Sequence, residues 1–469
     1  MSRRARCPRS TRWWLPAALL LGPALPAVAA AAPVVRFADA TGGPVRGGPG
    51  GRGLPIAIYG TGFGAQRGSS TVTIGGRPVA AYLEWGGVAT NPDLRRILVQ
   101  PGPGAVAGPI VVHVGGAASA PTATFTPTRG RILWVAPAGS DSAPCSQRRP
   151  CATIQHVIDR GLRPGDAVLV RGGQLTDDEV WLRATQGGTA TRPIVIRNAP
   201  GERPVFARTT RPVIVEGSHV VFAGFRFGPG KALVVGADPT GSDDIRAVDN
   251  SFSGNLGYAA VGTHGDNLLI AGNVCDATGS SQGTEGHCFY ISNGAHIRLL
   301  WNVGRGVPGY GIHIYDQRRS TPDIRRRITD VLVQGNTLTG STQRSGMIVA
   351  MDDEGHMGNL ISGVRVQGNT FMANNHVGLV IGGNVTGVRV TQNRFVQNGR
   401  QGVNVYDQPT IHGVRITGNL FDQRDNANCH VFCDWFPRAD VQVGAHAVGV
   451  VLRGNRYVRP RRVIGAPPG

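Results

Sequence analysis

The sequence contains a single lysine, Lys231, and aromatic residues make up only 6 % of its 469 residues. Any chemistry that needs a lysine is therefore confined to one position. Beyond the first 30 residues there is no apolar run long enough to span a bilayer. Glycine is abundant, at 69 residues, and glycine is unfavourable inside helices. Helical repeats are thus disfavoured, and short β runs with glycine turns are expected.

An Asn that closes a short β-rich run recurs through the second half of the chain. It stands at positions 250, 273, 302, 336, 369, 393, 419 and 455. These positions are 23 to 36 residues apart. A repeat of this length marks a stacked architecture, because one unit cannot bury its own apolar face. Each unit holds two or three short β runs between Gly and Asn turns. We predict an all-β chain dominated by a right-handed parallel β-helix. Its Asn residues would adopt the left-handed conformation at one corner and hydrogen-bond into a ladder.

The N-terminus has the pattern of a signal peptide, predicted for residues 1–31. Five arginines precede an apolar stretch from Trp13 to about Val28, and the small residues "AVAAAAP" follow. An uncleaved anchor is the alternative, disfavoured by three prolines and by the short apolar length. We expect a secreted protein, extracellular or periplasmic, with no membrane segment after cleavage near Ala31.

Six cysteines remain beyond the signal peptide, which fits an oxidising compartment. Cys145 with Cys151, and Cys429 with Cys433, would close small loops. Cys275 and Cys288 would pair across one coil. A metal site is the alternative, but the sequence has no CxxC pair.

The net charge is +19, or +14 without the five signal-peptide arginines. Such a field attracts polyanions. Nucleic acid is one candidate and an acidic extracellular polysaccharide is another, and export favours the polysaccharide. The plain alternative is that a GC-rich genome shaped an arginine-rich surface. We expect a monomer that binds an acidic extracellular polysaccharide and no nucleic acid.

Residues 33–127 read as a compact β-sandwich with alternating strands and Gly/Pro turns. The segments "IYGTGFG", "TVTIGGRPV" and "ILVQPGPGAVAGPIVVHV" resemble the IPT/TIG family, an immunoglobulin-like fold. In that family the module spaces, docks or binds glycans and is not catalytic. The segment "TPTRGR" after it is a plausible linker.

Residues 132–460 are predicted to form the solenoid, with a short capping helix at about 152–160. The segments "ILWVAPAGSDSAPCSQRRPCATIQHVIDRGLRPGDAVLVRGG" and "GGTATRPIVIRNAPGERPVF" resemble the first part of pectate lyase-like β-helix proteins, nearest to alginate and chondroitin lyases. The resemblance implies a helix that covers the open end of the core. That superfamily also holds hydrolases, epimerases, tail spikes and adhesins, so the reaction must be argued from the site.

Alignment of the strands that follow each Gly turn predicts two outward columns, since side chains alternate along a strand and neighbouring coils lie about 4.8 Å apart. The first column is Tyr290, His313, Ile348, Val380 and Asn404, and the second is Ser292, Tyr315, Ala350, Gly382 and Tyr406. The candidate catalytic residues on this face are His287, Tyr290, His313, Tyr315 and Asp316. The candidate substrate-binding residues are Arg318, Arg319, Tyr406 and Asp407.

These residue types suit β-elimination on a uronic acid, with His313 as base, Tyr290 or Tyr315 as acid, and Arg318 or Arg319 neutralising the carboxylate. Asp352, Asp353 and Glu354 are candidate Ca²⁺ ligands, with a solvated loop as the alternative. The lyases that the chain resembles use a lysine base, whereas Lys231 lies too early in the solenoid. Two other functions stay open: a non-catalytic glycan-binding or adhesion protein, and a hydrolase that pairs Asp316 with Asp352 or Asp353.

Overall fold

The computed structural model describes residues 32–207, 209, 211–236, 241–254, 256–280, 283–316, 327–351, 361–423, 428–431, 433–459 and 462–465. The predicted signal peptide lies outside these residues and stays a prediction. From residue 32 onward the chain forms one compact unit. Within the described part, no helix has the length and apolar character that a bilayer crossing requires.

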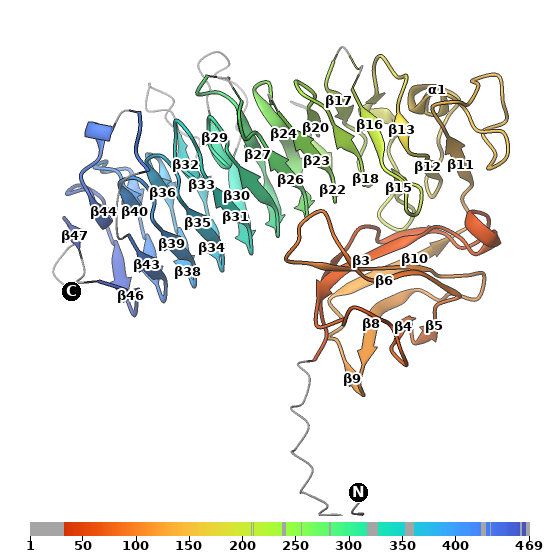
Figure 1. Cartoon of the computed structure of the whole chain (residues 1–469), viewed down its shortest axis with the longest axis horizontal. Helices are drawn as coiled ribbons and strands as arrows, with labels where there is room; N and C mark the ends of the chain where they lie inside the picture. The colour runs from red at the N-terminus through yellow and green to blue at the C-terminus, as the bar shows by residue number, and fades with distance from the viewer. Residues whose placement is uncertain are drawn as a thin grey trace, which may run out of the picture. The chain divides into compact units, whose positions relative to one another are not determined.

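The first described region is a β-sandwich of two sheets, as predicted (Figure 1). One sheet has the order β1 (Val34–Ala38), β3 (Ile56–Thr61), β7 (Arg95–Gln100), β6 (Ala81–Val88). The other has the order β2 (Gly42–Pro44), β10 (Ala123–Thr128), β8 (Gly108–Val114), β4 (Thr71–Ile74), β5 (Arg77–Pro78), with β9 (Ala117–Ala118) on β8 and the 3₁₀ turn η1 (Pro49–Gly51) beside β2 in sequence. Aliphatic side chains and the buried rings of Phe63 and Phe125 fill the space between the sheets.

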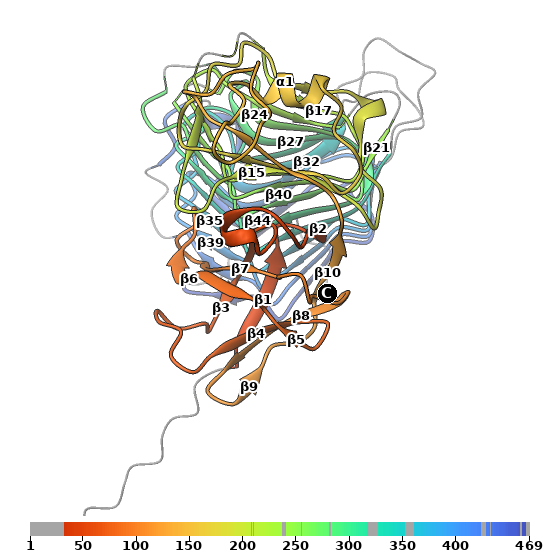
Figure 2. The same ribbon diagram turned by 90° about the vertical axis from the view of Figure 1, so that its right-hand side faces the viewer.

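The rest of the chain is a right-handed parallel β-helix, confirming the prediction. Each full coil gives one strand to each of three parallel sheets, and the coils stack one behind another (Figures 1 and 2). Sheet 1 consists of β14 (Trp181–Leu182), β17 (Val213–Val215), β20 (Leu233–Val235), β24 (Ala259–Asp266), β27 (His287–Leu300), β29 (Ile312–Asp316), β32 (Met347–Met351), β36 (Val377–Ile381), β40 (Gln401–Val405), β44 (Ala439–Val443) and β47 (Val463–Ile464).

Sheet 2 follows the next face of the coil and shares the long strand β27 with sheet 1. It consists of β11 (Ile132–Val135), β12 (Ala167–Val170), β15 (Ile194–Asn198), β18 (Val220–Ala223), β22 (Ile245–Val248), β25 (Leu269–Ala271), the second half of β27, β30 (Ile328–Gln334), β34 (Arg365–Gln367), β38 (Arg389–Thr391), β42 (Arg415–Thr417) and β45 (Val451–Arg453). Short strands precede some of these in the chain: β21 (Ser242–Asp243), β33 (Ile361–Ser362), β37 (Val385–Thr386) and β41 (Ile411–His412).

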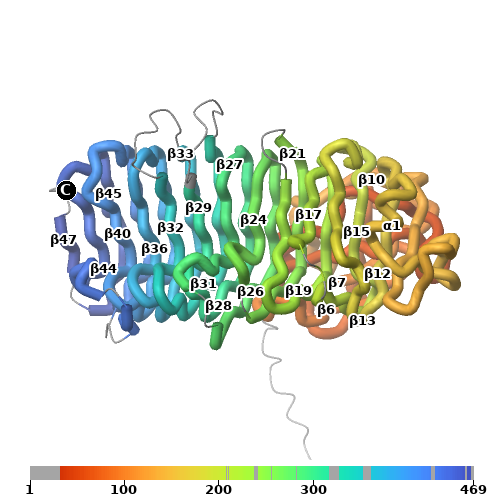
Figure 3. The backbone as a smooth tube through the Cα atoms, turned by 90° about the horizontal axis from the view of Figure 1, so that it is seen from above, coloured from red at the N-terminus to blue at the C-terminus, as the bar shows by residue number. Residues whose placement is uncertain are grey.

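Sheet 3 closes the coil, and the tube view in Figure 3 shows the regular succession of coils along the solenoid. It consists of β13 (Gly173–Gln174), β16 (Pro204–Phe206), β19 (Arg226–Phe227), β23 (Ser251–Ser253), β26 (Val274–Asp276), β28 (Val303–Arg305), β31 (Thr337–Thr339), β35 (Thr370–Met372), β39 (Arg394–Val396), β43 (Leu420–Asp422) and β46 (Arg456–Tyr457). Two 3₁₀ turns, η2 (Ala184–Gln186) and η3 (Cys433–Trp435), lie in connections.

Alternation along each strand builds one continuous apolar core. Rings are few, yet they stack: Phe371 lies 5.0 Å from Phe395, which lies 4.9 Å from Phe421, between ring centroids. The helix expected at 152–160 runs from Ile154 to Asp159 (α1), and the Thr153 side chain accepts a hydrogen bond from the His156 N–H at its start. Its apolar side joins the same core, so it shields the first coil as a solenoid cap must.

The predicted asparagine ladder is present and continuous from Asn250 to Asn455. At each step the backbone N–H and the side-chain amide of one Asn both donate to Oδ1 of the next, as from Asn336 to Asn369 at 2.8 and 2.9 Å. The predicted backbone conformation was wrong. The residue before each Asn has the positive φ, for example Gly335 at 67° and Gln392 at 55°. The Asn itself keeps ordinary φ because its side chain must point into the turn to bond the neighbouring coil.

We expect Asn369→Ala to lower the free energy of unfolding by about 3 kcal/mol or more. The substitution leaves the buried Val333 carbonyl without its 2.9 Å donor, and the Asn336 N–H without its 2.8 Å acceptor. Urea denaturation followed by circular dichroism measures the loss. Thr370→Ala, on the outward side of the next strand, is the matched control; an equal loss in both variants would contradict the ladder's role.

All three predicted disulfides are present: Cys145–Cys151, Cys275–Cys288 and Cys429–Cys433. The metal alternative is thereby disfavoured for these cysteines. The one cluster of metal-ligand type found among the described residues is Cys145, Cys151 and His156, and its two cysteines are joined to each other.

Asp249 ties the sandwich to sheet 2. Its carboxylate accepts from Tyr59 Oη at 3.0 Å, from Arg96 Nη1 at 2.9 Å and from the Thr90 N–H at 3.0 Å. Burial alone would raise the pKa of Asp249, but the charges of Arg203 and Arg96 and the bonds from Thr90 lower it. An apolar cluster that both domains share surrounds these polar contacts. Among the described residues, the contacts of the sandwich with sheet 2 run from β11 to Trp301, just after β27.

Candidate functional site

The strand register on sheet 1 confirms the first predicted column from Tyr290 to Asn404 and one step of the second. Tyr290 pairs with His313, and His313 pairs with Ile348. Ile348 pairs with Val380, which pairs with Asn404. In the second column Tyr315 pairs with Ala350. The alternate positions on these strands, Phe289 and Ile312 among them, belong to the solenoid core. Tyr290 and His313 thus point away from that core, as predicted.

His313 lies at the centre of a cluster of His and Tyr rings, which we call the His–Tyr cluster. Its ring centroid lies 4.2 Å from His287, 4.8 Å from Tyr290, and 5.0 Å from both Tyr310 and Tyr315. Tyr258 packs edge-on against His287 and Tyr290, at 5.5 and 5.4 Å. The structure therefore brings four of the five predicted catalytic residues together, His287, Tyr290, His313 and Tyr315.

The face that carries the cluster is buried, whereas an open face was expected. His313 and His287 are each 4 % exposed and Tyr290 is 9 % exposed. A second apolar cluster lies on this outer face, built on Ile348, Ala350, Val377 and Val380, with Tyr310, Tyr315, Tyr406 and Phe436 packed against it. Strand alternation predicts the direction in which a side chain points. It does not predict what packs over the outer face of the sheet, because that packing comes from the connections between strands.

Burial sets the charge state of both histidines. It lowers the pKa of His313 well below 6.5, and the neighbouring imidazole of His287 and the charge of Arg344 lower it further. Burial and then Arg344 lower the pKa of His287 to about 3. Nδ1 of His287 accepts the Tyr310 N–H at 3.0 Å, so its ring proton resides on Nε2. Nδ1 of His313 is buried and has no hydrogen-bond partner within the described residues. Both rings are neutral at pH 7.

Arg344 is the functional candidate that the sequence analysis missed. It lies in the turn between β31 and β32, it is half-buried, and its guanidinium has no hydrogen-bond or ion-pair partner in the part of the chain that the structure describes. Its charge acts on His287, Tyr310, His313, His376 and Tyr406. Among the described residues, Arg344 is therefore the arginine whose charge reaches His287, Tyr310 and His313.

A signal for Arg344 was present in the sequence. Each strand of sheet 1 begins near a Gly, and the residues two before Gly346, Gly378 and Gly402 are Arg344, His376 and Arg400. Backbone bonds confirm that these three stack on successive coils, since the His376 N–H donates to the Arg344 carbonyl and the Arg400 N–H to the His376 carbonyl. Extending the column alignment two residues back into the turn would have found the row.

The remaining predicted residues do not join the cluster as drawn. Tyr406 packs on the outer apolar cluster and its pKa is raised by burial. Asp407 is exposed and accepts from His446 at 3.0 Å. Asp316 ends β29, where its backbone pairs with Met351, and its side chain lies outside the description. Arg318, Arg319, Asp352, Asp353 and Glu354 also lie outside the described residues, so substrate binding by the two arginines and the Ca²⁺ site stay predictions.

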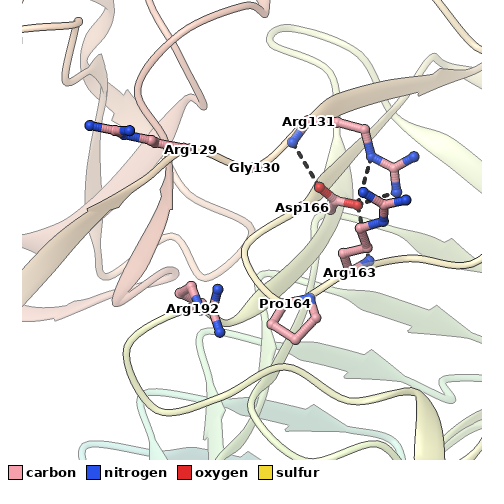
Figure 4. A pocket seen from close by; sticks show the side chains of 7 residues that line it. All are labelled: Arg129, Gly130, Arg131, Arg163, Pro164, Asp166 and Arg192. Carbon is pink, nitrogen blue, oxygen red and sulfur yellow. Dashed lines mark hydrogen bonds and ion pairs between the residues drawn. The ribbon is translucent and has the colours of Figure 1, made fainter.

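A separate pocket of about 400 Å³ lies where the linker meets the first coils, lined by arginines at 129, 131, 163 and 192 and by Asp166. Asp166 accepts from the Arg131 N–H at 2.7 Å, from Arg131 Nε at 3.0 Å and from the Arg163 N–H at 3.0 Å. Figure 4 shows that Arg129 and Arg192 lie apart from this pair and from each other. The arrangement fixes the linker and does not converge on a ligand. It also shows that half of the expected linker is strand β10.

The match of the first domain to a known family decides its assignment: the family described as the IPT/TIG domain matches residues 43–127. Residues 43–127 form an IPT/TIG domain. The IPT/TIG domain contributes no residue to the His–Tyr cluster, whose members all lie between residues 258 and 315. No curated protein matches the chain.

Solved structures similar to the chain are β-helix proteins of low sequence identity. The mannuronan C-5 epimerase AlgE4 A-module of Azotobacter vinelandii is 14 % identical with a TM-score of 0.38, over 67 % of this chain and 95 % of that one. The complex of XylC with xylose is 12 % identical with a TM-score of 0.36, over 62 % and 75 %. A rhamnogalacturonan lyase is 16 % identical with a TM-score of 0.34, over 69 % and 87 %. Matches this distant say nothing about the reaction, which rests on the residues of the site.

Proposed function

We propose that the protein is exported and cleaves an acidic polysaccharide by β-elimination at the His–Tyr cluster. The observation that carries the proposal is the neutral His313 ring, held among tyrosines and within reach of the charge of Arg344. Three disulfides support export, because such bonds persist in oxidising compartments.

His313 is the proposed base. Elimination on a uronate begins with removal of the proton next to the carboxylate, and a base must be unprotonated to take it. Burial keeps the His313 imidazole neutral. Its Nδ1 is buried and has no hydrogen-bond partner among the described residues, so the tautomer with the proton on Nε2 leaves that lone pair without a competing bond once the substrate reaches it. His287, stacked beside it, is neutral as well.

Arg344 is proposed to neutralise the substrate carboxylate. Removal of the adjacent proton places negative charge on that carboxylate, and a fixed cation stabilises the charge as it develops. A guanidinium matches a carboxylate with two parallel hydrogen bonds. Arg344 takes the role first assigned to Arg318 or Arg319.

Tyr315 or Tyr290 is proposed as the acid. Their rings lie 5.0 and 4.8 Å from His313, and Tyr315 is the more exposed of the two. His313 takes the proton, the electron pair forms the ring double bond, and the glycosidic bond breaks. The phenol O–H then protonates the departing oxygen. The products are an unsaturated uronate and a free hydroxyl end, with no water consumed.

Non-cleaving glycan binding is the second candidate function, and the low exposure of His313 and Tyr290 favours it. A cluster as buried as this one would also serve as a rigid support beneath an outer sugar-binding surface. The hydrolase alternative stays a prediction, because the side chains of Asp316, Asp352 and Asp353 lie outside the described residues.

Incubation with alginate, pectate, chondroitin and hyaluronan, followed by ultraviolet absorbance of the unsaturated product, separates these functions. We expect product from one of the four polymers. Binding without absorbance or new reducing ends would establish the binding protein. New reducing ends without absorbance would establish hydrolysis.

We expect the activity to be retained as the pH falls from 8 through 6.5. A histidine base works only when unprotonated, and the lowered pKa of His313 means that it protonates only well below 6.5. The pH dependence of kcat/KM reports this group in the free enzyme. A half-maximal rate near pH 6.5 would show that His313 is solvated or is not the base.

A further inference from the structure

The outer face of sheet 2 changes character along the solenoid. In the early coils it is apolar and packs on the IPT/TIG domain through residues such as Ala167, Val195 and Val221, which are paired in register. In the later coils the same column continues as Arg365, Arg389 and Arg415, paired in register on strands β34, β38 and β42. Figure 1 shows β34 and β38 on successive coils, away from the early coils that the domain covers.

These three residues line a groove of about 590 Å³, which we call the arginine track. Beside them stand Gly363, Gly387 and Gly413, with φ of 67°, 67° and 65°. Positive φ favours glycine at each corner, and the missing side chains leave a strip of bare backbone along the arginines. The next outward column, Gln367, Thr391 and Thr417, adds polar groups along the other side.

The track carries charge that the described residues do not compensate. Asp330 pairs with Arg365 at 2.7 Å and with Arg298 at 3.0 Å. Arg389 and Arg415 are exposed, and neither has an ion pair or side-chain hydrogen bond within the described residues. Like charges side by side on neighbouring strands are destabilising. A bound anion that bridges the two guanidinium groups would remove that repulsion.

We propose that the arginine track binds a segment of acidic polysaccharide, on a different sheet from the His–Tyr cluster. Successive coils lie about 4.8 Å apart, so the guanidinium groups form a row that suits a polymer with repeated carboxylates. Single-stranded nucleic acid is bound on aromatic platforms, and the track residues include no aromatic side chain. The choice of polymer rests on the proposed function, whereas the binding of an anionic chain does not.

The test compares two double variants with the same change of charge. Arg389→Gln/Arg415→Gln removes the uncompensated part of the track. Arg394→Gln/Arg456→Gln removes two exposed arginines from sheet 3 and is the matched control. Titration calorimetry with alginate and pectate oligosaccharides, in two salt concentrations, measures affinity and its salt dependence.

We expect the track variant to bind at least tenfold more weakly, with a shallower salt dependence, and the control to bind like the unaltered protein. Equal affinity of the track variant and the control overturns the proposal. Tighter binding of single-stranded DNA, lost in the track variant, would assign the track to nucleic acid and also overturn it. Because binding is measured without turnover, loss of binding in the track variant supports the track even if no polymer is cleaved. If the polymer is cleaved and the track variant binds it as tightly as the unaltered protein does, the arginine track is rejected and the proposed function is not.

Discussion

Replacement of His313 by Gln is expected to lower kcat for elimination by about 10²–10⁴-fold, the contribution of a positioned general base. Glutamine keeps an amide of similar reach but cannot take a proton. Since His313 packs against four rings, the change in KM should be small compared with the change in kcat. Initial rates of unsaturated product formation, measured over a range of substrate concentrations, separate the two constants.

Two comparisons distinguish a chemical role of His313 from a packing role. His113→Gln, in strand β8 of the IPT/TIG domain, changes the same residue type far from the cluster in sequence and should leave kcat unaltered. His313→Ala should regain part of its activity when imidazole is added, because the small base can enter the space that the ring vacates. Full activity of His313→Gln would remove His313 as the base. A loss without imidazole rescue, accompanied by a lower melting temperature, would assign it to packing.

Replacement of Arg344 by Gln is expected to lower kcat/KM by about 10²–10³-fold, the usual effect of removing one group that stabilises developing charge. The kcat/KM of Arg344→Lys should lie between those of the unaltered protein and Arg344→Gln, because lysine keeps the charge and loses the two-bond match to a carboxylate. Arg394→Gln, exposed on sheet 3, is the control for a loss of one positive charge.

The decisive measurement for Arg344 uses a methyl-esterified substrate. Esterification removes the carboxylate charge, so the unaltered protein and Arg344→Gln should then react at similar rates. A penalty that persists with the ester would contradict the neutralising role. The pH profile supplies an independent check. The positive charge of Arg344 lowers the pKa of His313 and His287, so its removal should move the acid limb to higher pH.

The sequence predicted the fold better than it predicted the surroundings of the site. The Asn positions predicted the ladder because identical side chains at one corner of each coil bond their neighbours. Strand alternation predicted that Tyr290 and His313 would be neighbours, since a period of two leaves only two faces to choose between. Both inferences rest on local periodicity, which a single sequence displays directly.

The burial of the His–Tyr cluster and the role of Arg344 were not predicted, and the reason is a different one. Burial of His313 depends in part on Tyr310, which comes from the connection between β28 and β29. Arg344 lies in another such connection, outside any strand alignment. The ladder corner differs from the prediction for a separate, local reason: the residue before the Asn, such as Gly335 or Gln392, adopts the left-handed conformation.

The amino-acid sequence by itself determined the coil, its register, the disulfide pairs and the sandwich ahead of it, because each follows from spacing along the chain. Tertiary structure alone decided that the His–Tyr cluster is buried and its histidines neutral, that the charge of Arg344 reaches it, and that the arginine track is left uncovered by the IPT/TIG domain. Those properties depend on which non-adjacent segments pack over each face, and packing of that kind leaves no period in the sequence.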